Sequence, residues 1–280
     1  MSIAAWICGI IAIGLFLYWQ LVIAEGTYFG QGVVTYLYDL TAPRYDSIKQ
    51  FDREIEAIFV GRPIADALRK IDNPLILDIA TGTGRVPRAL LDQPSFDGHV
   101  VGLDASWEML EIAHMHLRRA EHIVDLVCRD STNLPFPDGG FDLVSCIEML
   151  EFTRSPQRQL IQAYRVLRPG GVLLTTRRRG FDALLLPGRT QTPNGFRMLL
   201  QNIGFTSVDI GRWQVDYDLV WAAKGPAAMR HESTKEMVLL CDSCAHEMRK
   251  VATTQFHCNF CEDIITVRDG IVDYRLKRRP

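Results

Sequence analysis

The sequence lacks an excess of either charge, and it lacks internal repeats and low-complexity segments. Lys and Arg number 31 against 33 Asp and Glu, so the formal net charge is -2. No global basic field points to nucleic acid, and no nucleic-acid partner is expected. Hydrophobic residues make up 48% of the chain and charged residues 23%, which excludes a disordered chain. The 280 residues allow one catalytic domain and smaller additions.

Charge is absent from the first stretch of the chain, Met1 to Ala24, and Glu25 is the first charged residue. As a helix, residues 3–24 would reach roughly 33 Å, which matches a hydrocarbon core of about 30 Å. A secretory signal peptide is the alternative, but the stretch lacks a positive first region and a clear cleavage site. Residues 1–25 are therefore predicted to be an uncleaved transmembrane anchor.

After an amphipathic lead-in, short apolar runs alternate with helical patterns. This alternation predicts βαβ units and a mostly parallel sheet with helices on both faces. The last two runs have no helix between them, which predicts an antiparallel hairpin at one edge. The fold class is thus α/β, with a Rossmann-like, mostly parallel seven-stranded sheet. The predicted strands are 75–79, 100–103, 123–127, 141–146, 172–175, 208–210 and 217–221, and the helices between them include 85–91, 108–119 and 156–167.

A glycine-containing turn, Thr81-Gly82-Thr83-Gly84, separates the first of these strands from a helix start. Glycine permits a positive φ and the close approach of a ligand. The next strand ends in Asp104, about 20 residues on, where an acid can accept hydrogen bonds from both ribose hydroxyls. A nicotinamide enzyme has the same spacing, but the turn lacks the third glycine of G-x-G-x-x-G. Asp78, inside the first strand, instead favours a ligand that carries a positive charge.

Further motifs follow in order along the chain. They are L-D-I-A-T-G-T-G at 77–84, G-L-D-A-S-x-x-M-L at 102–110, Arg129-Asp130 before L-P-F-P-D-G-G-F-D-L-V at 134–144, and L-R-P-G-G at 167–171. With these motifs the chain resembles the class I S-adenosylmethionine-dependent methyltransferases over about residues 38–224. Within that family it looks most like the quinone-biosynthesis branch. The family usually has glycine at the position of Ala80. This difference is expected to affect the affinity for the cofactor more than the fold.

The resemblance implies S-adenosylmethionine as the cofactor and assigns roles to single residues. Asp78 and the turn would meet its methionine and ribose side, Asp104 its ribose hydroxyls, and Asp130 with Ser131 its adenine amine. Met109 would pack on the adenine face, and Ile147 would line the methionine end. The cofactor-binding residues implied in this way are Asp78, Ala80, Thr81, Gly82, Gly84, Asp104, Ala105, Met109, Asp130, Ser131 and Ile147.

No catalytic base is assigned. Methyl transfer from a sulfonium is an in-line displacement, which positioning of the two reactants can accelerate without a dedicated side chain. An acceptor that must lose a proton would need a base, and Glu148, Glu151 and Tyr45 lie in the right region for one. His114 and His116 are two residues apart on a helix, so they cannot share one face and are expected at the surface.

Two segments after the fifth predicted strand bear on the acceptor. Three consecutive arginines, residues 177–179, would either meet anionic head groups or form a solvated face, and the second interpretation is favoured because adjacent residues splay apart. The segment 181–197 is rich in Leu, Gly and Pro, and it is expected to cover the acceptor.

Four of the seven cysteines form two C-x2-C pairs separated by thirteen residues. Two such knuckles close a tetrahedral four-thiolate site, which predicts structural zinc, with iron as the minority alternative. The module resembles the zinc-ribbon family that activates methyltransferases, although Asp242 and Val272 stand where that family has proline. His246 and His257 adjoin the knuckles but are expected outside the ligand set. The predicted metal ligands are Cys241, Cys244, Cys258 and Cys261.

These features predict four units: a transmembrane anchor (1–25), a methyltransferase domain (26–224), a linker (225–236), and a zinc-ribbon-like module with a basic tail (237–280). The predicted function is methylation of a lipophilic, membrane-associated acceptor such as a quinone precursor or lipid. The alternative is a methyltransferase whose ribbon recruits a protein or RNA acceptor, and the ribbon leaves a protein partner open. The implied cofactor places the catalytic domain on the cytoplasmic side of a single span.

Overall fold

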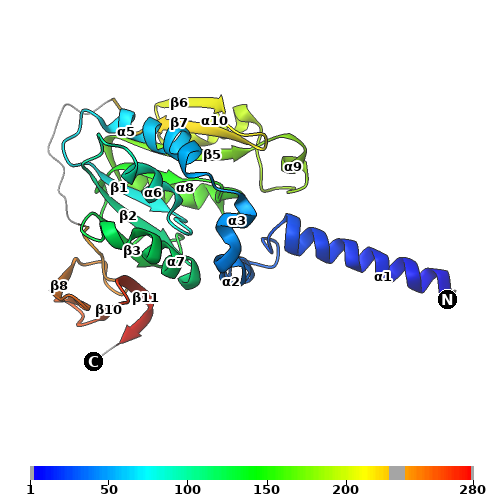
Figure 1. Cartoon of the computed structure of the whole chain (residues 1–280), viewed down its shortest axis with the longest axis horizontal. Coiled ribbons are helices and arrows are strands. Elements are labelled where there is room, and N and C mark those ends of the chain that lie inside the picture. The colour runs from blue at the N-terminus through cyan, green and yellow to red at the C-terminus, as the bar shows by residue number, and fades with distance from the viewer. Residues whose placement is uncertain (1–2, 227–236, 279–280) are drawn as a thin grey trace.

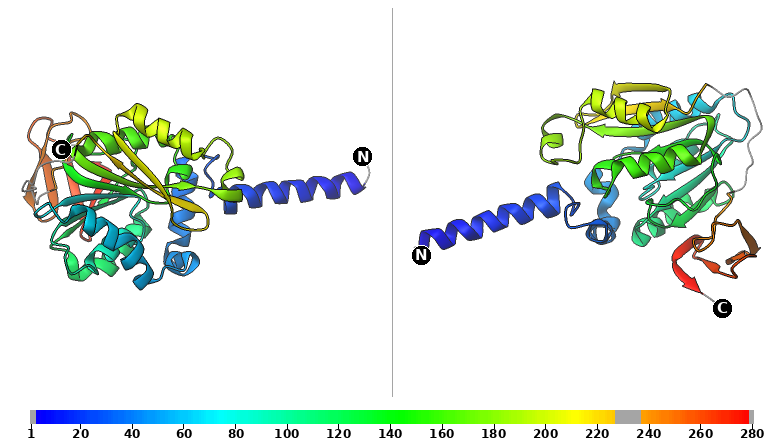
Figure 2. Two further views of the ribbon diagram at one scale, coloured as in Figure 1. Left: turned by 90° about the horizontal axis from the view of Figure 1, so that it is seen from above. Right: turned by 180° about the vertical axis from the view of Figure 1, so that it is seen from behind.

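The computed structural model describes residues 3–226 and 237–278, so most of the linker predicted at 225–236 lies outside the described residues. An isolated N-terminal helix projects from one side of an α/β domain, and a small β module lies at another edge (Figure 1). The two further views show the same arrangement (Figure 2). The N-terminal helix and the cysteine module are therefore well separated from each other.

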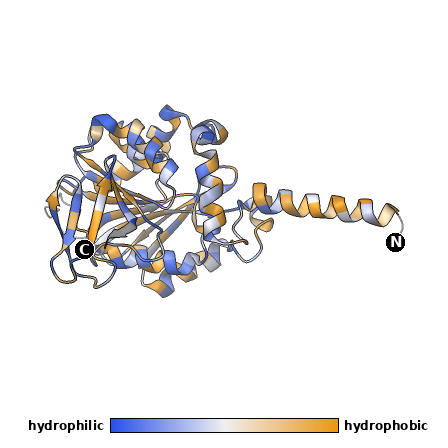
Figure 3. Ribbon diagram, turned by 90° about the horizontal axis from the view of Figure 1, so that it is seen from below, coloured by the Kyte–Doolittle hydropathy of each residue, from blue (hydrophilic) through white to orange (hydrophobic). Residues whose placement is uncertain are grey.

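The projecting helix consists of α1 (Ile3–Tyr18) and a π-helical turn, η1 (Trp19–Ile23). Within the described part of the chain, it is the one helix long and apolar enough to cross a membrane, with a mean hydropathy of 2.1. Apolar residues occupy all sides of it, and the domain covers few of them (Figure 3). The predicted N-terminal apolar helix is confirmed.

Short helices connect the projecting helix to the sheet. Asp52 caps one of them by accepting hydrogen bonds from the backbone N–H groups of Glu54 and Ile55. Gly61 packs so tightly that a Cβ would lie 2.0 Å from the carbonyl oxygen of Ala89, so only glycine fits there. The elements are α2 (Gln31–Thr41), η2 (Ala42–Arg44), α3 (Tyr45–Lys49), α4 (Arg53–Glu56), η3 (Ala57–Gly61) and α5 (Arg62–Leu68).

The central sheet contains the seven predicted strands in the order β6-β7-β5-β4-β1-β2-β3. The five strands from β5 to β3 are parallel, whereas β7 pairs antiparallel with both β5 and β6. The predicted edge hairpin is thus confirmed. The strands are β1 (Leu75–Ile79), β2 (His99–Asp104), β3 (Val124–Cys128), β4 (Phe141–Cys146), β5 (Leu167–Arg178), β6 (Ser207–Arg212) and β7 (Tyr217–Ala223).

Helices cover both faces of the sheet because the parallel strands are apolar on both sides; all of β1 is buried, for example. One apolar core lies under α8 and α10, and the other lies under α5, α6 and α7. The helices and turns between the strands are α6 (Arg85–Leu91), α7 (Trp107–Leu117), η4 (Arg118–Ala120), η5 (Leu150–Phe152), α8 (Pro156–Val166), α9 (Gly180–Leu184) and α10 (Pro193–Ile203).

The cysteine module continues the central sheet. Its strands are β8 (Met248–Ala252), β9 (Gln255–Cys258), β10 (Ile264–Arg268) and β11 (Ile271–Arg278), and they pair antiparallel with one another. β11 pairs parallel with β3, with Ile271 opposite Leu126 and Asp273 opposite Cys128. The sheet therefore has eleven strands, and Leu239, Phe256 and Tyr274 of the module join a core of the α/β domain.

Candidate active site

A pocket opens at the carboxyl ends of β1, β2 and β4, the edge at which open α/β sheets bind ligands. The hollow and its open mouth together enclose about 760 Å³. Seven residues implied by the motifs line it together, although they come from four separate segments. They are Ala80, Gly82, Asp104, Ala105, Asp130, Ser131 and Ile147.

The other four implied residues lie elsewhere. Asp78 and Thr81 line a smaller hollow that adjoins the pocket and shares Ala80 and Gly82 with it. Gly84 forms the N-cap of α6 with a φ of 86°, and Met109 is fully buried. Neither of these two lines the described hollows, so their assignment to the cofactor stays a prediction.

Asp104 stands at the end of β2, where the pocket meets the glycine turn. Its Oδ2 accepts a hydrogen bond from the backbone N–H of Gly82 at 2.8 Å, and its Oδ1 accepts one from that of Ser106 at 2.9 Å. Burial raises the pKa of this carboxyl, while the backbone hydrogen bonds oppose the shift. The carboxylate therefore fixes the turn and keeps lone pairs for hydroxyl groups of a ligand.

Asp78 lies deeper, within β1, and is 2% exposed. Its Oδ1 accepts a hydrogen bond from Ser145 Oγ at 2.7 Å. Burial raises the pKa of Asp78 to about 7, although hydrogen bonds from the hydroxyl groups of Ser145 and Thr81 oppose the shift. A buried carboxylate beside a hollow suits a ligand group that carries a positive charge.

The turn between β1 and α6 follows a left-handed path. Ala80, Gly82 and Gly84 have φ values of 57°, 55° and 86°. Ala80 thus adopts the conformation for which the family uses glycine, at a cost of order 1 kcal/mol for a residue with a Cβ. Ala80 therefore preserves the path of the turn. This agrees with the expectation that alanine at this position has little effect on the fold.

The wall opposite the turn comes from α2 and from the segment after β4. Residues of α2 line this wall, including Val34, Thr35 and Tyr38, and Phe152 and Thr153 continue it. Sequence analysis missed these residues, apart from the aromatic, amphipathic character of the lead-in. α2 begins eight positions after Ile23, the last residue of the projecting helix. Val34 and Tyr38 of this wall pack with Ala24, the residue that ends the apolar helix.

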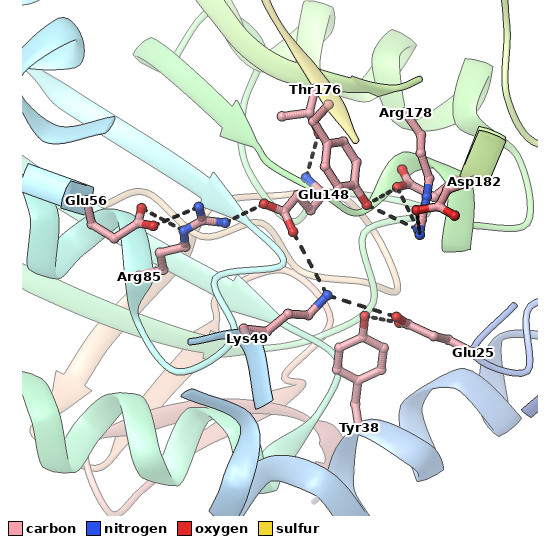
Figure 4. A network of polar contacts seen from close by, with 11 residues as sticks. Glu25, Tyr38, Lys49, Glu56, Arg85, Glu148, Thr176, Arg178 and Asp182 are labelled. Atoms are coloured by element: carbon pink, nitrogen blue, oxygen red, sulfur yellow. Dashed lines mark hydrogen bonds and ion pairs between the residues drawn. The ribbon is translucent and has the colours of Figure 1, made fainter. Parts of the chain in front are cut away.

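A polar network joins the lead-in to the segment after β4 (Figure 4). Lys49 Nζ lies 4.0 Å from a carboxylate oxygen of Glu25 and 3.9 Å from one of Glu148. Arg85 donates to Glu148 at 2.7 Å and to Glu56 at 2.8 and 2.9 Å. Because two cations hold Glu148, its carboxylate is placed to tie the lead-in to the sheet.

The remaining candidate bases also have structural partners. Tyr217 donates a hydrogen bond to buried Glu151 at 2.5 Å, and burial raises the pKa of Glu151. Burial likewise raises the pKa of Tyr45 well above its usual value. His114 and His116 lie on α7 outside the pocket. No single side chain stands out as a base.

The arginines at 177–179, at the end of β5, are a correction to the sequence analysis. Arg177 and Arg179 both pair with Asp218, and Arg178 lies 3.7 Å from Glu151 and 3.9 Å from Asp182. All three side chains are at most one quarter exposed. They form neither a head-group patch nor a solvated face, because acids from β7, η5 and α9 face them.

The segment 181–197 does not line the pocket, and its role as a cover for the acceptor stays a prediction. Leu186 and Phe196 pack into apolar cores, whereas Phe181 and Leu184 are exposed. α2 and η5 line the pocket instead.

The four predicted ligand cysteines form a compact cluster. Their Sγ atoms all lie within 4.8 Å of one another, with three separations of 3.4 Å, and all four cysteines are free thiols. Ala245 and Glu262, which follow the second cysteine of each knuckle, both have a positive φ. Two equivalent turns thus aim four thiolates at one point, which is the donor set of a tetrahedral metal site.

The cysteine module touches the pocket through Arg129, which lines it next to Asp130. Arg129 forms an ion pair with Asp242 of the first knuckle, and its guanidinium lies 4.9 Å from the ring centre of Tyr274 on β11. The backbone N–H of Leu240 also donates to the carbonyl oxygen of Pro135. Folding of the module is therefore mechanically linked to one end of the pocket.

Residues 77–175 match the family model described as a methyltransferase domain. A demethylmenaquinone methyltransferase of Renibacterium salmoninarum is 31% identical over 141 residues, which cover 50% of this chain and 56% of the relative. The chain thus spans about half the length of this curated relative.

Two solved structures share the fold. An S-adenosylmethionine-dependent methyltransferase from Aquifex aeolicus has a TM-score of 0.51 at 18% identity, covering 62% of this chain and 99% of that chain. A chain from the complex between the Haloferax volcanii Trm112 methyltransferase activator and a methyltransferase has a TM-score of 0.54 at 19% identity, covering 67% and 97%.

The sheet order and the glycine turn give the Rossmann-like fold that solved S-adenosylmethionine-dependent methyltransferases share, and residues 77–175 match the model of a methyltransferase domain. Within the class, the domain is similar to the demethylmenaquinone methyltransferases.

Proposed function

We propose that this protein is a membrane-anchored methyltransferase that uses S-adenosylmethionine to methylate a lipophilic acceptor of the quinone type. The observation that carries the proposal is the pocket at the carboxyl edge of the sheet, one wall of which follows directly from the apolar helix. The similarity to demethylmenaquinone methyltransferases supports a quinone as the acceptor. A tethered enzyme meets acceptors that share its bilayer at a raised local concentration.

The cofactor would lie along the motif residues of the pocket. Asp104 would accept hydrogen bonds from the ribose hydroxyls, and Asp130 with Ser131 would face the adenine. Asp78 and the glycine turn would face the methionine end, next to Ile147. The bound cofactor supplies an electrophilic methyl group, and the protein contributes by holding the acceptor in line with it. Tyr38 and Val34 of α2 would line the acceptor side.

The four-cysteine cluster would bind one structural zinc ion, since four thiolates leave no open position for a reactant. Zinc would hold the module whose β11 extends the sheet, and the module would support the pocket through Arg129. With the catalytic domain on the cytoplasmic side of a single span, the pocket would have access to the cofactor and to the bilayer.

Binding of the cofactor is expected to weaken as the pH falls below about 7. The pKa of Asp78 lies at about 7, well above its value of 3.8 in the unfolded chain. The free protein therefore holds a proton there at low pH, and a cationic ligand must displace it. The dissociation constant should rise by up to about tenfold per pH unit below 7 and stay level above it.

Calorimetry between about pH 6 and pH 8, in two buffers of different ionisation enthalpy, measures both the affinity and the released proton. Asp78→Asn should remove this pH dependence, whereas Asp130→Asn, at the far end of the pocket, should keep it. Equal affinity across the range in the unaltered protein would argue against the placement of Asp78.

Labelled methyl groups should appear in the lipid extract when membranes that contain the full chain receive labelled S-adenosylmethionine and demethylmenaquinone. A variant lacking residues 2–18 should bind the cofactor equally well but methylate the membrane-held quinone poorly. The cut leaves Trp19 and Gln20 in place because Gln20 is buried and Trp19 contacts the domain. Equal turnover by both proteins on vesicle-borne quinone would show that the anchor only localises the enzyme.

The same experiment tests the alternative in which the ribbon recruits a macromolecular acceptor. Label that migrates with protein or RNA, and is absent from the solvent extract, would favour that alternative over the quinone.

A further inference from the structure

We propose that α9 and its flanking residues, 180–188, form a second membrane contact that inserts Phe181 and Leu184 into the bilayer surface beside the span. This inference rests on the membrane anchoring proposed above and goes beyond it, because it fixes the orientation of the catalytic domain. Three features support the contact: the apolar face of α9, the attachment of the residues after it to the end of the anchor helix, and the position of both on one side of the domain.

The outer face of α9 is unusually apolar for an exposed surface. Phe181 is 72% exposed and Leu184 is 76% exposed, and their spacing of three residues places them on the same side of the helix. The one acid of the helix, Asp182, faces the domain, where it lies 3.9 Å from Arg178 (Figure 4). The charge is thus paired on the protein side, and the two large apolar side chains point outward.

The residues after α9 are attached to the last turn of the anchor helix. The indole N–H of Trp19 donates to the carbonyl oxygen of Leu185 at 2.8 Å. Tyr28, whose ring centre lies 5.2 Å from that of Trp19, donates to the carbonyl oxygen of Pro187 at 2.8 Å. Leu186 is fully buried with Ala24 in the small apolar core at this junction. α9 is therefore held at the level at which the anchor enters the domain.

The views of the ribbon place α9 on the side of the domain from which α1 projects (Figures 1 and 2). A bilayer that surrounds α1 has its surface near Trp19, because indole and phenol rings favour the interface. The exposed side chains of Phe181 and Leu184 then lie at the level of that interface. Two contacts, unlike one flexible tether, fix the tilt of the domain and hold the pocket wall formed by α2 near the lipid.

A lipid surface fits this face of α9, because the face continues the apolar surface of the span. Val22 and Leu21 at the end of the anchor are exposed, and Phe29 in the following turn is 50% exposed. Like Phe181 and Leu184, they belong to segments that lie next to the junction of the helix and the domain. A protein partner seated on α9 would have to share this position with the bilayer.

Photocrosslinking tests the contact in the full chain. p-Benzoylphenylalanine replaces one phenylalanine at a time in protein reconstituted into phosphatidylcholine and phosphatidylglycerol vesicles. Phe181 is the test position, Phe16 within the span is the positive control, and Phe260 on the cysteine module is the matched negative control, 69% exposed. After illumination, mass spectrometry of tryptic peptides identifies lipid adducts; the peptide 180–189 reports on α9. Binding of S-adenosylmethionine verifies that each variant is folded.

Lipid adducts at position 181 are expected at a yield near that of position 16 and several-fold above that of position 260. If lipid adducts form at position 16 but are no more frequent at position 181 than at position 260, the second contact is overturned and the anchor is supported. Absence of adducts at 16 would remove the span, and with it both proposals. Crosslinks from 181 to another protein chain in place of lipid would also overturn the inference, because the face would then be a protein interface.

Discussion

Replacing Cys244 by serine is expected to release the metal and unfold the C-terminal module. The apolar side chains of the module, such as Leu239 and Phe256, are buried in a core shared with the α/β domain, so the two knuckles depend on metal binding, which supplies of order 10–16 kcal/mol in structural zinc sites of this kind. Loss of one of four thiolates therefore removes more free energy than the module can replace. Zinc content per chain and protease cleavage within residues 237–278 measure this directly, and chelation of the unaltered protein should reproduce the result.

The same substitution should weaken the cofactor pocket without abolishing it. The α/β domain keeps its own sheet and helices, but the edge of β3 loses β11, and Arg129 loses its contacts with Asp242 and Tyr274. Affinity for S-adenosylmethionine should fall by several-fold, and turnover should fall further. Cys8→Ser, which makes the same chemical change outside the cluster, should leave both unchanged. A metal-free chain whose C-terminal cleavage is unaltered by chelation would contradict the zinc site.

Asp104→Ala should weaken binding of S-adenosylmethionine by about 1.5–3 kcal/mol, or roughly 10- to 150-fold, the scale of lost charge-assisted hydrogen bonds. Its carboxylate lies in the pocket and also accepts hydrogen bonds from the backbone of Gly82 and Ser106. Asp104→Asn keeps the size and one acceptor oxygen, so it should produce a smaller loss. Titration calorimetry measures the affinities.

A control variant separates loss of ligand contacts from damage to the fold. Asp125→Ala removes an acid from β3, where it pairs with His99 at 2.8 Å outside the pocket. It should leave the affinity unchanged. Thermal unfolding of each variant without ligand shows how far the turn itself depends on Asp104. Unchanged affinity in Asp104→Ala would remove this residue from the cofactor site.

Much of the candidate site could be predicted because its signals are local. Asp104 follows the second strand at a spacing that a βαβ unit imposes, and the structure places it beside Gly82 as that spacing requires. Met109, which the motif assigns to the adenine face, is fully buried in α7, and its contact with the cofactor stays a prediction.

Contacts between distant segments account for what sequence analysis missed or predicted wrongly. Arg177 and Arg179 look like part of a surface charge run until β7 brings Asp218 to them. Tyr38 lies far from every motif, and only the return of α2 over the sheet edge makes it part of the pocket. Neither the ion pairs with Asp218 nor the position of Tyr38 can be predicted from a periodicity or a spacing in the sequence.

By itself, the sequence determined the apolar helix, the order and nature of the strands, the glycine turn and the four-thiolate cluster. Each of these follows from hydrophobic period, conformational freedom or ligand spacing within a few dozen residues, and such local preferences are present before the chain folds. The tertiary structure alone decided that β11 extends the sheet at β3, that α2 forms a pocket wall, and that the residues after α9 meet the end of the projecting helix. These features depend on which surfaces are left to be buried once the local elements have formed, and that choice is made by the packing of the whole chain.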